Sequence, residues 1–227
     1  MFDRISETFR FFAGHWWAIG VVVWLFAFPT LLMDLLITPP EPGLDGQPDF
    51  SGDYYKYTFG LMLILTPLSN VVLPLKLRSI LDQQSRPLGM LIQQGLGLWL
   101  KSFMTLFLMG IALFFGFMLF ILPGIYLMAR MVYAPFYVAF EAAGPVDAIK
   151  RSMDATREDH WSLLGVLLFF WSVVLLIHLM LSGMAGDMRQ IAVVLQFTIA
   201  PLTALVTIAA LRFFDLHHAT YQRPPNE

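Results

Sequence analysis

The fold is decided by the stretch from Leu98 to Ala142, which reads LWLKSFMTLFLMGIALFFGFMLFILPGIYLMARMVYAPFYVAFEA. It is about twice as long as the roughly 20 apolar residues that cross a hydrocarbon core about 30 Å thick. Near its middle, Leu122-Pro123-Gly124 signals a turn, because proline lacks a backbone donor and glycine tolerates left-handed geometry. The stretch therefore predicts two membrane-spanning helices, Leu98–Leu122 and Gly124–Ala142, joined by a tight hairpin.

Four more apolar stretches are long enough, or nearly so, to cross the same core. They are Trp16–Ile37, Tyr57–Leu77, Trp161–Ser182 and Ile191–Phe213. The first has an apolar run longer than the roughly 7–15 residues of a signal peptide, so we expect it to be retained. The sequence thus predicts an all-α, polytopic integral membrane protein with six transmembrane helices, forming a single domain over residues 1–227.

The composition excludes an ordinary soluble protein. Hydrophobic residues make up 58% of the 227 residues and charged residues only 13%, against typical shares of about 45–50% and about 25%. So much apolar surface cannot be hidden in one small globule, and it also excludes intrinsic disorder. The chain has no cysteine and a net charge of −2, which leave no thiolate chemistry and no electrostatic footprint for nucleic acid.

The lysines and arginines predict the orientation, because cytoplasmic loops of membrane proteins are enriched in them. With the N-terminus inside, eleven fall on the cytoplasmic side: Arg4, Arg10, Lys76, Arg78, Arg86, Lys101, Lys150, Arg151, Arg157, Arg212 and Arg223. Only Lys56 and Arg189 fall on the other side. We therefore expect both termini in the cytoplasm and the protein in a bacterial cytoplasmic (inner) membrane.

Two segments have the pattern of amphipathic interfacial helices. Their apolar residues recur at steps of three and four, in Phe2, Ile5, Phe9 and Phe12 and again in Val146, Ile149, Met153 and Thr156. Gly144-Pro145 starts the second helix with proline where its missing donor costs nothing. Both segments fit helices that lie in the headgroup region, and the alternative is a pair of connectors packed on the bundle.

The fourth predicted span carries one polar face. Its members follow each other at steps of four, three, four and four residues: Tyr126, Arg130, Tyr133, Tyr137 and Glu141. At about 100° per residue they share one narrow side of a helix. Tyrosine combines an apolar ring with a polar tip, so the face suits a groove for a lipid or a substrate. Ordinary helix packing with satisfied hydroxyl groups explains it equally.

Four polar residues come out at similar depth in the outer half of the membrane. They are Asp34, Arg130, His178 and Gln196. Ionisable groups inside a span cost about 2.5–3.5 kcal/mol each on insertion scales and need a reason to be there. One hypothesis is a shared intramembrane polar layer that forms a proton-coupled or anion-attracting cavity. The other is structural, with an Asp34–Arg130 pair and interhelical hydrogen bonds from the remaining two.

A resemblance to a known family rests on the region after the hairpin. The residues that carry it are Leu122-Pro123-Gly124-Ile125-Tyr126, Ala134-Pro135, Gly144-Pro145, Ala148, Arg151-Ser152 and Thr156. This pattern resembles the YciC-like family of bacterial inner-membrane proteins, which look related to the membrane domain of some glycerophosphodiester phosphodiesterases. The resemblance implies a six-helix membrane protein without an established biochemical function. No phosphodiesterase activity carries over, because the chain has no room for that catalytic domain.

The sequence contains no nucleophile–base spacing, nucleotide loop or metal-binding motif. We therefore expect no catalytic residue, no cofactor and no metal. The leading hypothesis is a non-enzymatic protein that maintains the envelope through contacts with membrane lipids, a membrane-protein partner or a second copy. The alternative is a small transporter or lipid flippase-like carrier that uses the Tyr126–Glu141 face. A membrane-embedded enzyme is the third hypothesis.

Overall fold

The computed structural model describes residues 2–37, 52–84, 86–157, 160–185 and 189–221. Within these ranges the chain is helical and has no strand, which confirms the all-α class. The elements are α1 (Phe2–Leu36), α2 (Asp53–Leu81), α3 (Leu88–Leu119), α4 (Ile121–Met131), α5 (Ala134–Glu141), α6 (Pro145–Ala155), α7 (His160–Ala185), α8 (Arg189–Ile199), a short 3₁₀ helix η1 (Ala200–Thr203) and α9 (Ala204–Tyr221).

Among the described residues, six segments are long and apolar enough to cross a membrane, as predicted. They are Ile5–Leu36, Asp53–Leu81, Leu88–Leu119, Ile121–Glu141, His160–Leu181 and Val193–Leu216. The third begins well before the predicted Leu98, because Gln93, Gln94 and three glycines lower the hydropathy of its first turns without stopping a helix. The chain is a polytopic helical membrane protein.

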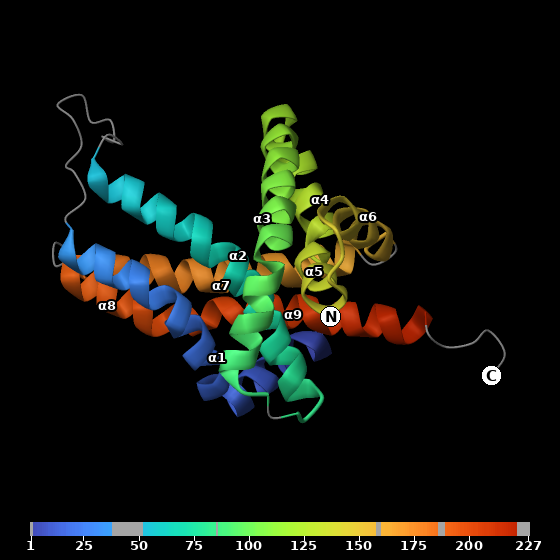
Figure 1. Cartoon of the computed structure of the whole chain (residues 1–227), viewed down its shortest axis with the longest axis horizontal. Helices are drawn as coiled ribbons and strands as arrows, with labels where there is room; N and C mark the ends of the chain where they lie inside the picture. Colours follow the sequence, from blue (N-terminus) through green and yellow to red (C-terminus); the bar gives the residue numbers. More distant parts are fainter. Residues whose placement is uncertain (1, 38–51, 85, 158–159, 186–188, 222–227) are drawn as a thin grey trace.

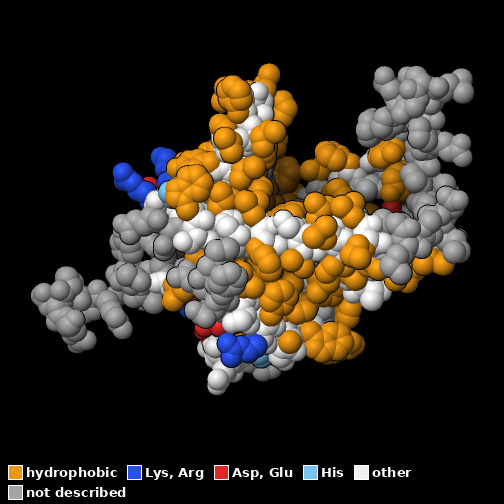
Figure 2. Space-filling model, turned by 180° about the vertical axis from the view of Figure 1, so that it is seen from behind, with side chains coloured by type: hydrophobic (Ala, Val, Ile, Leu, Met, Phe, Trp, Pro, Cys, Tyr) orange, Lys and Arg blue, Asp and Glu red, His pale blue; other side chains and the backbone are white. Residues whose placement is uncertain are grey.

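The helix pair α3 and α4 projects from the rest of the molecule as a hairpin (Figure 1). The C-terminal ends of α1 and α7 and the N-terminal ends of α2 and α8 lie together on one side, while the C-terminal end of α9 extends the opposite way. On the face shown in Figure 2, hydrophobic side chains cover the projecting hairpin and much of the body. Such an exposed apolar surface is expected where the neighbours are lipid tails.

The hairpin turns at Phe120, so the prediction that Pro123-Gly124 forms the turn is wrong. Phe120 is extended (φ −165°, ψ 160°), and its amide donates to the carbonyl of Gly116 at 3.2 Å. Pro123 and Gly124 lie in the first turns of α4. A proline is tolerated at the start of a helix, because the first N–H groups of a helix have no partner within it. Leu122-Pro123-Gly124 thus marks the beginning of a helix just after the turn.

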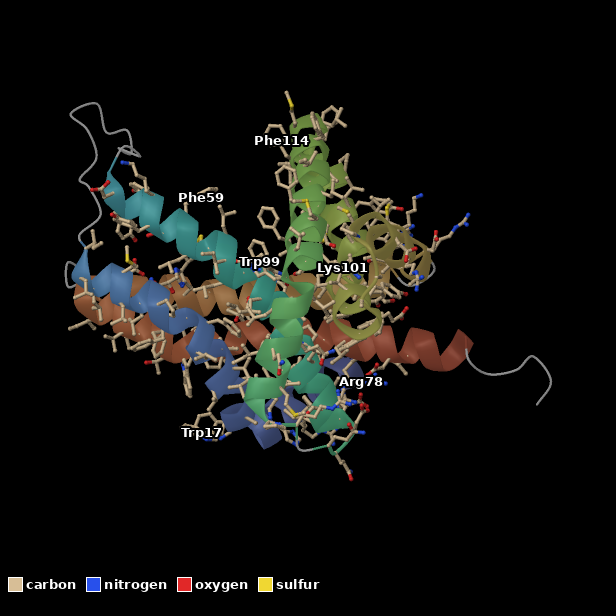
Figure 3. All side chains as sticks on the ribbon, in the orientation of Figure 1. Trp17, Phe59, Arg78, Trp99, Lys101 and Phe114 are labelled. Carbon is tan, nitrogen blue, oxygen red and sulfur yellow. The ribbon has the colours of Figure 1, made fainter. Side chains whose placement is uncertain are left out.

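Two bonds from α3 support α2 around Pro67, where the proline removes a backbone donor. Trp99 donates its Nε1–H to the carbonyl of Ile64 at 2.9 Å, and the Ser102 hydroxyl donates to the carbonyl of Pro67 at 2.8 Å. The two helices cross closely at Gly95, where an added Cβ would lie 2.8 Å from a methyl group of Val72. From this crossing, α2 and the hairpin diverge, with Trp99 near their junction (Figure 3).

The N-terminal aromatic segment is the first part of α1, before a kink at His15 (φ −130°, ψ 16°). It packs on the bundle: the rings of Phe9 and Phe170 lie 5.3 Å apart, and the guanidinium of Arg212 lies 5.2 Å from the ring centroid of Phe11. The segment is therefore helical as expected and makes the contacts of a connector packed on the bundle.

Helix α6 also packs on the bundle, through a face shifted by about one residue from the one predicted: of the predicted residues, Thr156 is buried and Ile149 packs against the core. Its buried residues are the small ones, Ala148, Ser152 and Ala155, whereas Val146 is 55% exposed. Small side chains let the backbone of α6 approach α5 closely, which the apolar periodicity did not reveal.

Candidate functional site

A break in the fourth span separates α4 from α5. Pro135, the second residue of α5, has no N–H and cannot make the bond that would continue α4. The buried hydroxyl of Ser152 on α6 stabilises the break by donating to the carbonyl of Arg130 (2.8 Å) and accepting from the amide of Tyr133 (3.0 Å). The Thr156 hydroxyl donates to the same Arg130 carbonyl at 3.1 Å.

This geometry gives a structural role to the residues between Ala134 and Thr156 that carry the family resemblance. Pro135 breaks the helix, and Ser152 and Thr156 satisfy the backbone groups that the break frees. Ala134 and Ala148 are both fully buried (0% exposed), where a larger side chain would separate the two helices. The pattern from Ala134 to Thr156 therefore encodes a helix break together with the helix that supports it.

The break also divides the predicted polar face, so the prediction of one uninterrupted helix through it is wrong. The two central tyrosines, Tyr133 and Tyr137, are only 2% and 5% exposed. Their rings pack on Phe214, with centroids 5.5 Å and 5.1 Å apart. These two side chains belong to the core, as expected from helix packing.

The remaining members of the face have separate surroundings. Arg130 is 8% exposed, its guanidinium lies 5.7 Å from the ring centroid of Tyr126, and its Nε has no hydrogen-bond partner among the described residues. Tyr126 is 39% exposed and meets the ring of His160 edge-on at 5.5 Å. Glu141, at the end of α5, accepts a hydrogen bond from Arg151 at 2.7 Å.

The predicted pair between Asp34 and Arg130 is wrong. Asp34 accepts a hydrogen bond of 2.5 Å from the hydroxyl of Tyr54, near the C-terminal end of α1. Arg130 lies on α4, and these two regions are on opposite sides of the molecule (Figure 1). His178 is exposed on α7, and Gln196 is half-buried on α8. Because the hairpin diverges from the other helices, similar depth along separate spans does not bring Arg130 to Asp34. A polar layer through Asp34, His178 and Gln196 stays a prediction.

An apolar cleft of about 460 Å³ lies where α2, α3, α4, α5, α7 and α9 meet. Representative lining residues are Ser69 and Asn70 of α2, Met109 of α3, Met128 of α4, Trp171 of α7 and Val206 of α9. The walls are otherwise almost wholly aliphatic and aromatic. We refer to this space as the cleft.

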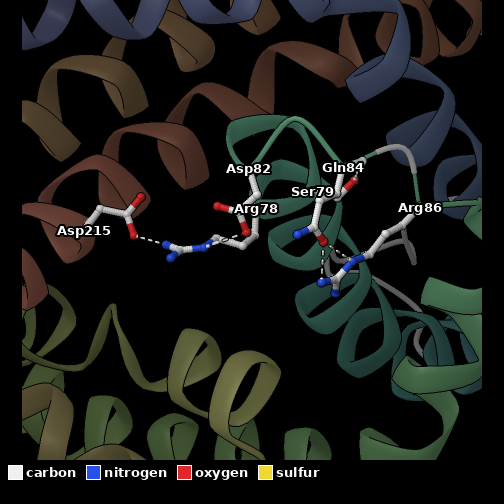
Figure 4. A network of polar contacts seen from close by, with 6 residues as sticks. All are labelled: Arg78, Ser79, Asp82, Gln84, Arg86 and Asp215. Atoms are coloured by element: carbon white, nitrogen blue, oxygen red, sulfur yellow. Dashed lines mark hydrogen bonds and ion pairs between the residues drawn. The ribbon is translucent and has the colours of Figure 1, made fainter.

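A second space, the polar basin, has a volume of about 610 Å³. Its ionisable lining residues are Arg78, Asp82, Arg86, Glu141 and Asp215. Arg78 forms ion pairs with Asp215 and, at 3.4 Å, with Asp82 (Figure 4).

The edge of the polar basin carries two more arginine contacts. Arg86 donates from Nε (3.1 Å) and Nη2 (2.7 Å) to the side-chain oxygen of Gln84. Arg151, which holds Glu141, also contacts Asp147 at 2.9 Å. The hydrogen bond to Asp147 and the charge of this carboxylate raise the pKa of Arg151 above its usual value.

Neither space was predicted from the sequence. One signal for them was present: Asn70, Pro74, Arg78 and Asp82 repeat at four-residue steps across the predicted end of the second span. Such a spacing places residues on one face of a helix. The apolar walls carry no comparable signal, because leucines that line a cleft look the same in sequence as leucines that face lipid.

The fold and its exposed apolar surface define a polytopic α-helical membrane protein. The chain belongs to the family described as Domain of unknown function (DUF7847), whose model matches residues 85–219. This match includes the hairpin, the helix break and α6. No curated protein and no solved structure matched the chain. The family match does not test the resemblance to the YciC-like proteins, which stays a prediction.

Proposed function

We propose that this protein is a non-enzymatic lipid-binding protein of the bacterial cytoplasmic membrane, and that it helps to maintain the envelope through lipid or partner contacts. The observation that carries the proposal is the apolar cleft between the hairpin and the body. Its volume, about 460 Å³, lies within the roughly 300–1,000 Å³ of typical ligand sites. Its aliphatic walls match the chemistry of an acyl chain.

The surroundings of the cleft support a lipid rather than a water-soluble compound. The two diverging segments, α2 and the α3–α4 hairpin, have exposed apolar side chains: Phe59 on α2 is 64% exposed and Phe114 on α3 is 65% exposed (Figure 3). A molecule that approaches between α2 and the hairpin meets hydrocarbon-like surface throughout. The few polar groups, such as the hydroxyl of Ser69 and the amide of Asn70, already donate to the carbonyl of Thr66.

The carrier hypothesis has less support. A transport path along the Tyr126–Glu141 face would have to displace Tyr133 and Tyr137 from their contacts with Phe214. Both tyrosines are core residues, only 2% and 5% exposed. The cleft is a space that an apolar chain can enter while both tyrosines stay in place.

The orientation with both termini in the cytoplasm is part of the proposal. It is supported by the clustering around the polar basin of Arg78 at the end of α2, Arg86 between α2 and α3, and Arg151 on α6. These residues come from connections that the Lys/Arg rule assigns to one side of the membrane.

The test uses the full chain in vesicles that contain a phospholipid with a photoreactive diazirine in its acyl chain. We expect adducts on Met109 and Met128 in the cleft and on the exposed Phe114. Val206→Phe, which fills the cleft, should abolish the adducts at the two methionines and leave the adduct at Phe114 unchanged. Val194→Phe is the matched control, because Val194 is 50% exposed on α8 and does not line the cleft.

Equal labelling of Met109 in both variants, or no labelling of Met109 in the natural sequence, would reject the proposal. Thermal unfolding in detergent checks that Val206→Phe folds. If it does not, Thr207→Phe fills the same cleft from the neighbouring position.

A further inference from the structure

The cleft and the polar basin follow one another along the same helices. On α2, Asn70 and Pro74 line the cleft, and Arg78 and Asp82 line the polar basin. These four residues are spaced by four, so they lie on one face of α2. At about 1.5 Å per residue, the basin begins only one turn beyond the cleft.

The other two walls repeat this order. On α5, Phe136 lines the cleft and Phe140 the polar basin; on α9, Ala210 lines the cleft and Phe214 the polar basin. Aromatic packing lies between the two spaces, with the ring centroid of the buried Phe214 at 5.5 Å from that of Phe136 and 5.8 Å from that of Phe140. The cleft and the polar basin are therefore two compartments of one groove, with Phe214 as the partition.

The charges of the polar basin select the headgroup. Its lining carries two arginines and three carboxylates, a formal charge of −1. Arg78 is held between two of the carboxylates. Arg86, whose partner is the neutral Gln84, is the cation that a phosphate meets without displacing an ion pair. At the edge of the basin, Arg151 is shared between Glu141 and Asp147, so this pair of contacts adds no net positive charge. The basin thus offers one arginine for a phosphate and an excess of carboxylates for a cationic group.

We infer that the groove binds a phospholipid with a primary-amine headgroup, with one acyl chain in the cleft and the headgroup in the polar basin. This inference rests on the proposed lipid-binding function and deepens it. Arg86 holds the phosphate, and Glu141 and Asp82 accept hydrogen bonds from the ammonium group. Phe214 turns aside to let the lipid occupy both compartments.

The charge pattern also says which headgroups are rejected. An anionic headgroup without an amine places negative charge beside three carboxylates. A quaternary ammonium has no N–H to donate, whereas a primary ammonium has three. Hydrogen bonds between charged groups contribute about 1.5–3 kcal/mol, so the amine should give at least about a tenfold preference.

The experiment titrates the purified full chain in detergent with three short-chain probes: dioctanoyl phosphatidylethanolamine, phosphatidylglycerol and phosphatidylcholine. Native mass spectrometry counts bound lipid, and the thermal unfolding midpoint reports binding independently. We expect the ethanolamine probe to bind at least about tenfold more tightly than the other two. Glu141→Gln should reduce this preference, and Arg86→Gln should weaken the binding of the ethanolamine probe. Asp154→Asn is the control, because Asp154 is an exposed carboxylate outside the polar basin.

Equal affinity for the three probes, a preference for phosphatidylglycerol, or binding insensitive to Arg86→Gln would overturn the headgroup assignment. These outcomes leave the proposed function intact if Val206→Phe still removes acyl-chain labelling of the cleft. Loss of that labelling effect would reject both. Phe214→Ala, which removes the partition, should speed binding of the ethanolamine probe, and unchanged kinetics would exclude the predicted role of Phe214.

Discussion

Gly116 and Gly124 bring the two helices of the hairpin into contact through their backbones. A Cβ on Gly116 would lie 3.1 Å from the Cα of Gly124, and a Cβ on Gly124 would lie 2.4 Å from a ring carbon of Phe117. Small residues permit this approach, and van der Waals packing then holds helices together in a membrane. The projecting hairpin depends on this contact, because its outer residues, including Phe120 and Leu122, are more than 70% exposed.

Gly124→Val should destabilise the protein strongly. The added side chain must push Phe117 and α3 away, and overpacking of this kind typically costs about 1–3 kcal/mol. The measurement is the thermal unfolding midpoint in detergent. Gly110→Val is the control on the same hairpin, because no atom lies within 4 Å of a Cβ there. Equal effects of the two substitutions would mean that the backbone contact does not stabilise the hairpin.

Ser152→Ala should cost about 1–3 kcal/mol, since it leaves the amide of Tyr133 without its hydrogen-bond acceptor in a buried place. Ser69→Ala removes a hydroxyl that donates to the carbonyl of Thr66 within its own helix, so it should have a much smaller effect. Unfolding midpoints of the two variants compare them directly. A Ser152→Ala variant as stable as Ser69→Ala would contradict the supporting role of α6.

The number of spans, the all-α class and the presence of the hairpin were predictable from the sequence, because each depends on long apolar runs and one turn signal. The helix break was not, although Ala134-Pro135 was visible. A proline alone does not say whether a helix bends or ends, and the answer depends on Ser152, which is brought close only by the fold. The prediction of an Asp34–Arg130 pair was wrong for a similar reason: the depth of a residue along its span does not give the direction of that helix relative to the others.

The double-mutant cycle of Asp34→Asn and Arg130→Gln should be additive in unfolding free energy, to within about 0.5 kcal/mol. Residues without shared partners usually behave in this way, and Asp34 contacts Tyr54 whereas Arg130 contacts Tyr126. A coupling energy above about 1 kcal/mol would show that the two charges interact.

Ala142→Gly should stabilise the protein slightly, by up to about 1 kcal/mol. Ala142 ends α5 in the left-handed region (φ 52°, ψ 31°), which costs a non-glycine residue about 1–2 kcal/mol. The greater freedom of glycine in the unfolded chain offsets part of this gain. Ala139→Gly, inside the same helix, should instead lower the unfolding midpoint. A decrease for both variants would contradict the prediction.

Single cysteines at Lys56 and Asp154 test the proposed orientation, because the chain has no other cysteine. Both positions are exposed, and the Lys/Arg rule assigns them to opposite sides of the membrane. In intact cells, a membrane-impermeant thiol reagent should label Lys56→Cys and spare Asp154→Cys until the membrane is permeabilised. The reverse pattern would invert the topology.

The helix break between α4 and α5 also has a consequence for biosynthesis. The carbonyl of Arg130 can accept its hydrogen bond only after Ser152, 22 residues later in the chain, has been synthesised. At a synthesis rate of about 5–20 residues per second, this delay is on the order of one to four seconds. During that interval the nascent fourth span has unsatisfied backbone groups, which favour a position beside water or the insertion machinery over one among lipid tails. The hairpin can settle into the bilayer only after α6 has emerged, so the order of translation becomes part of the folding pathway.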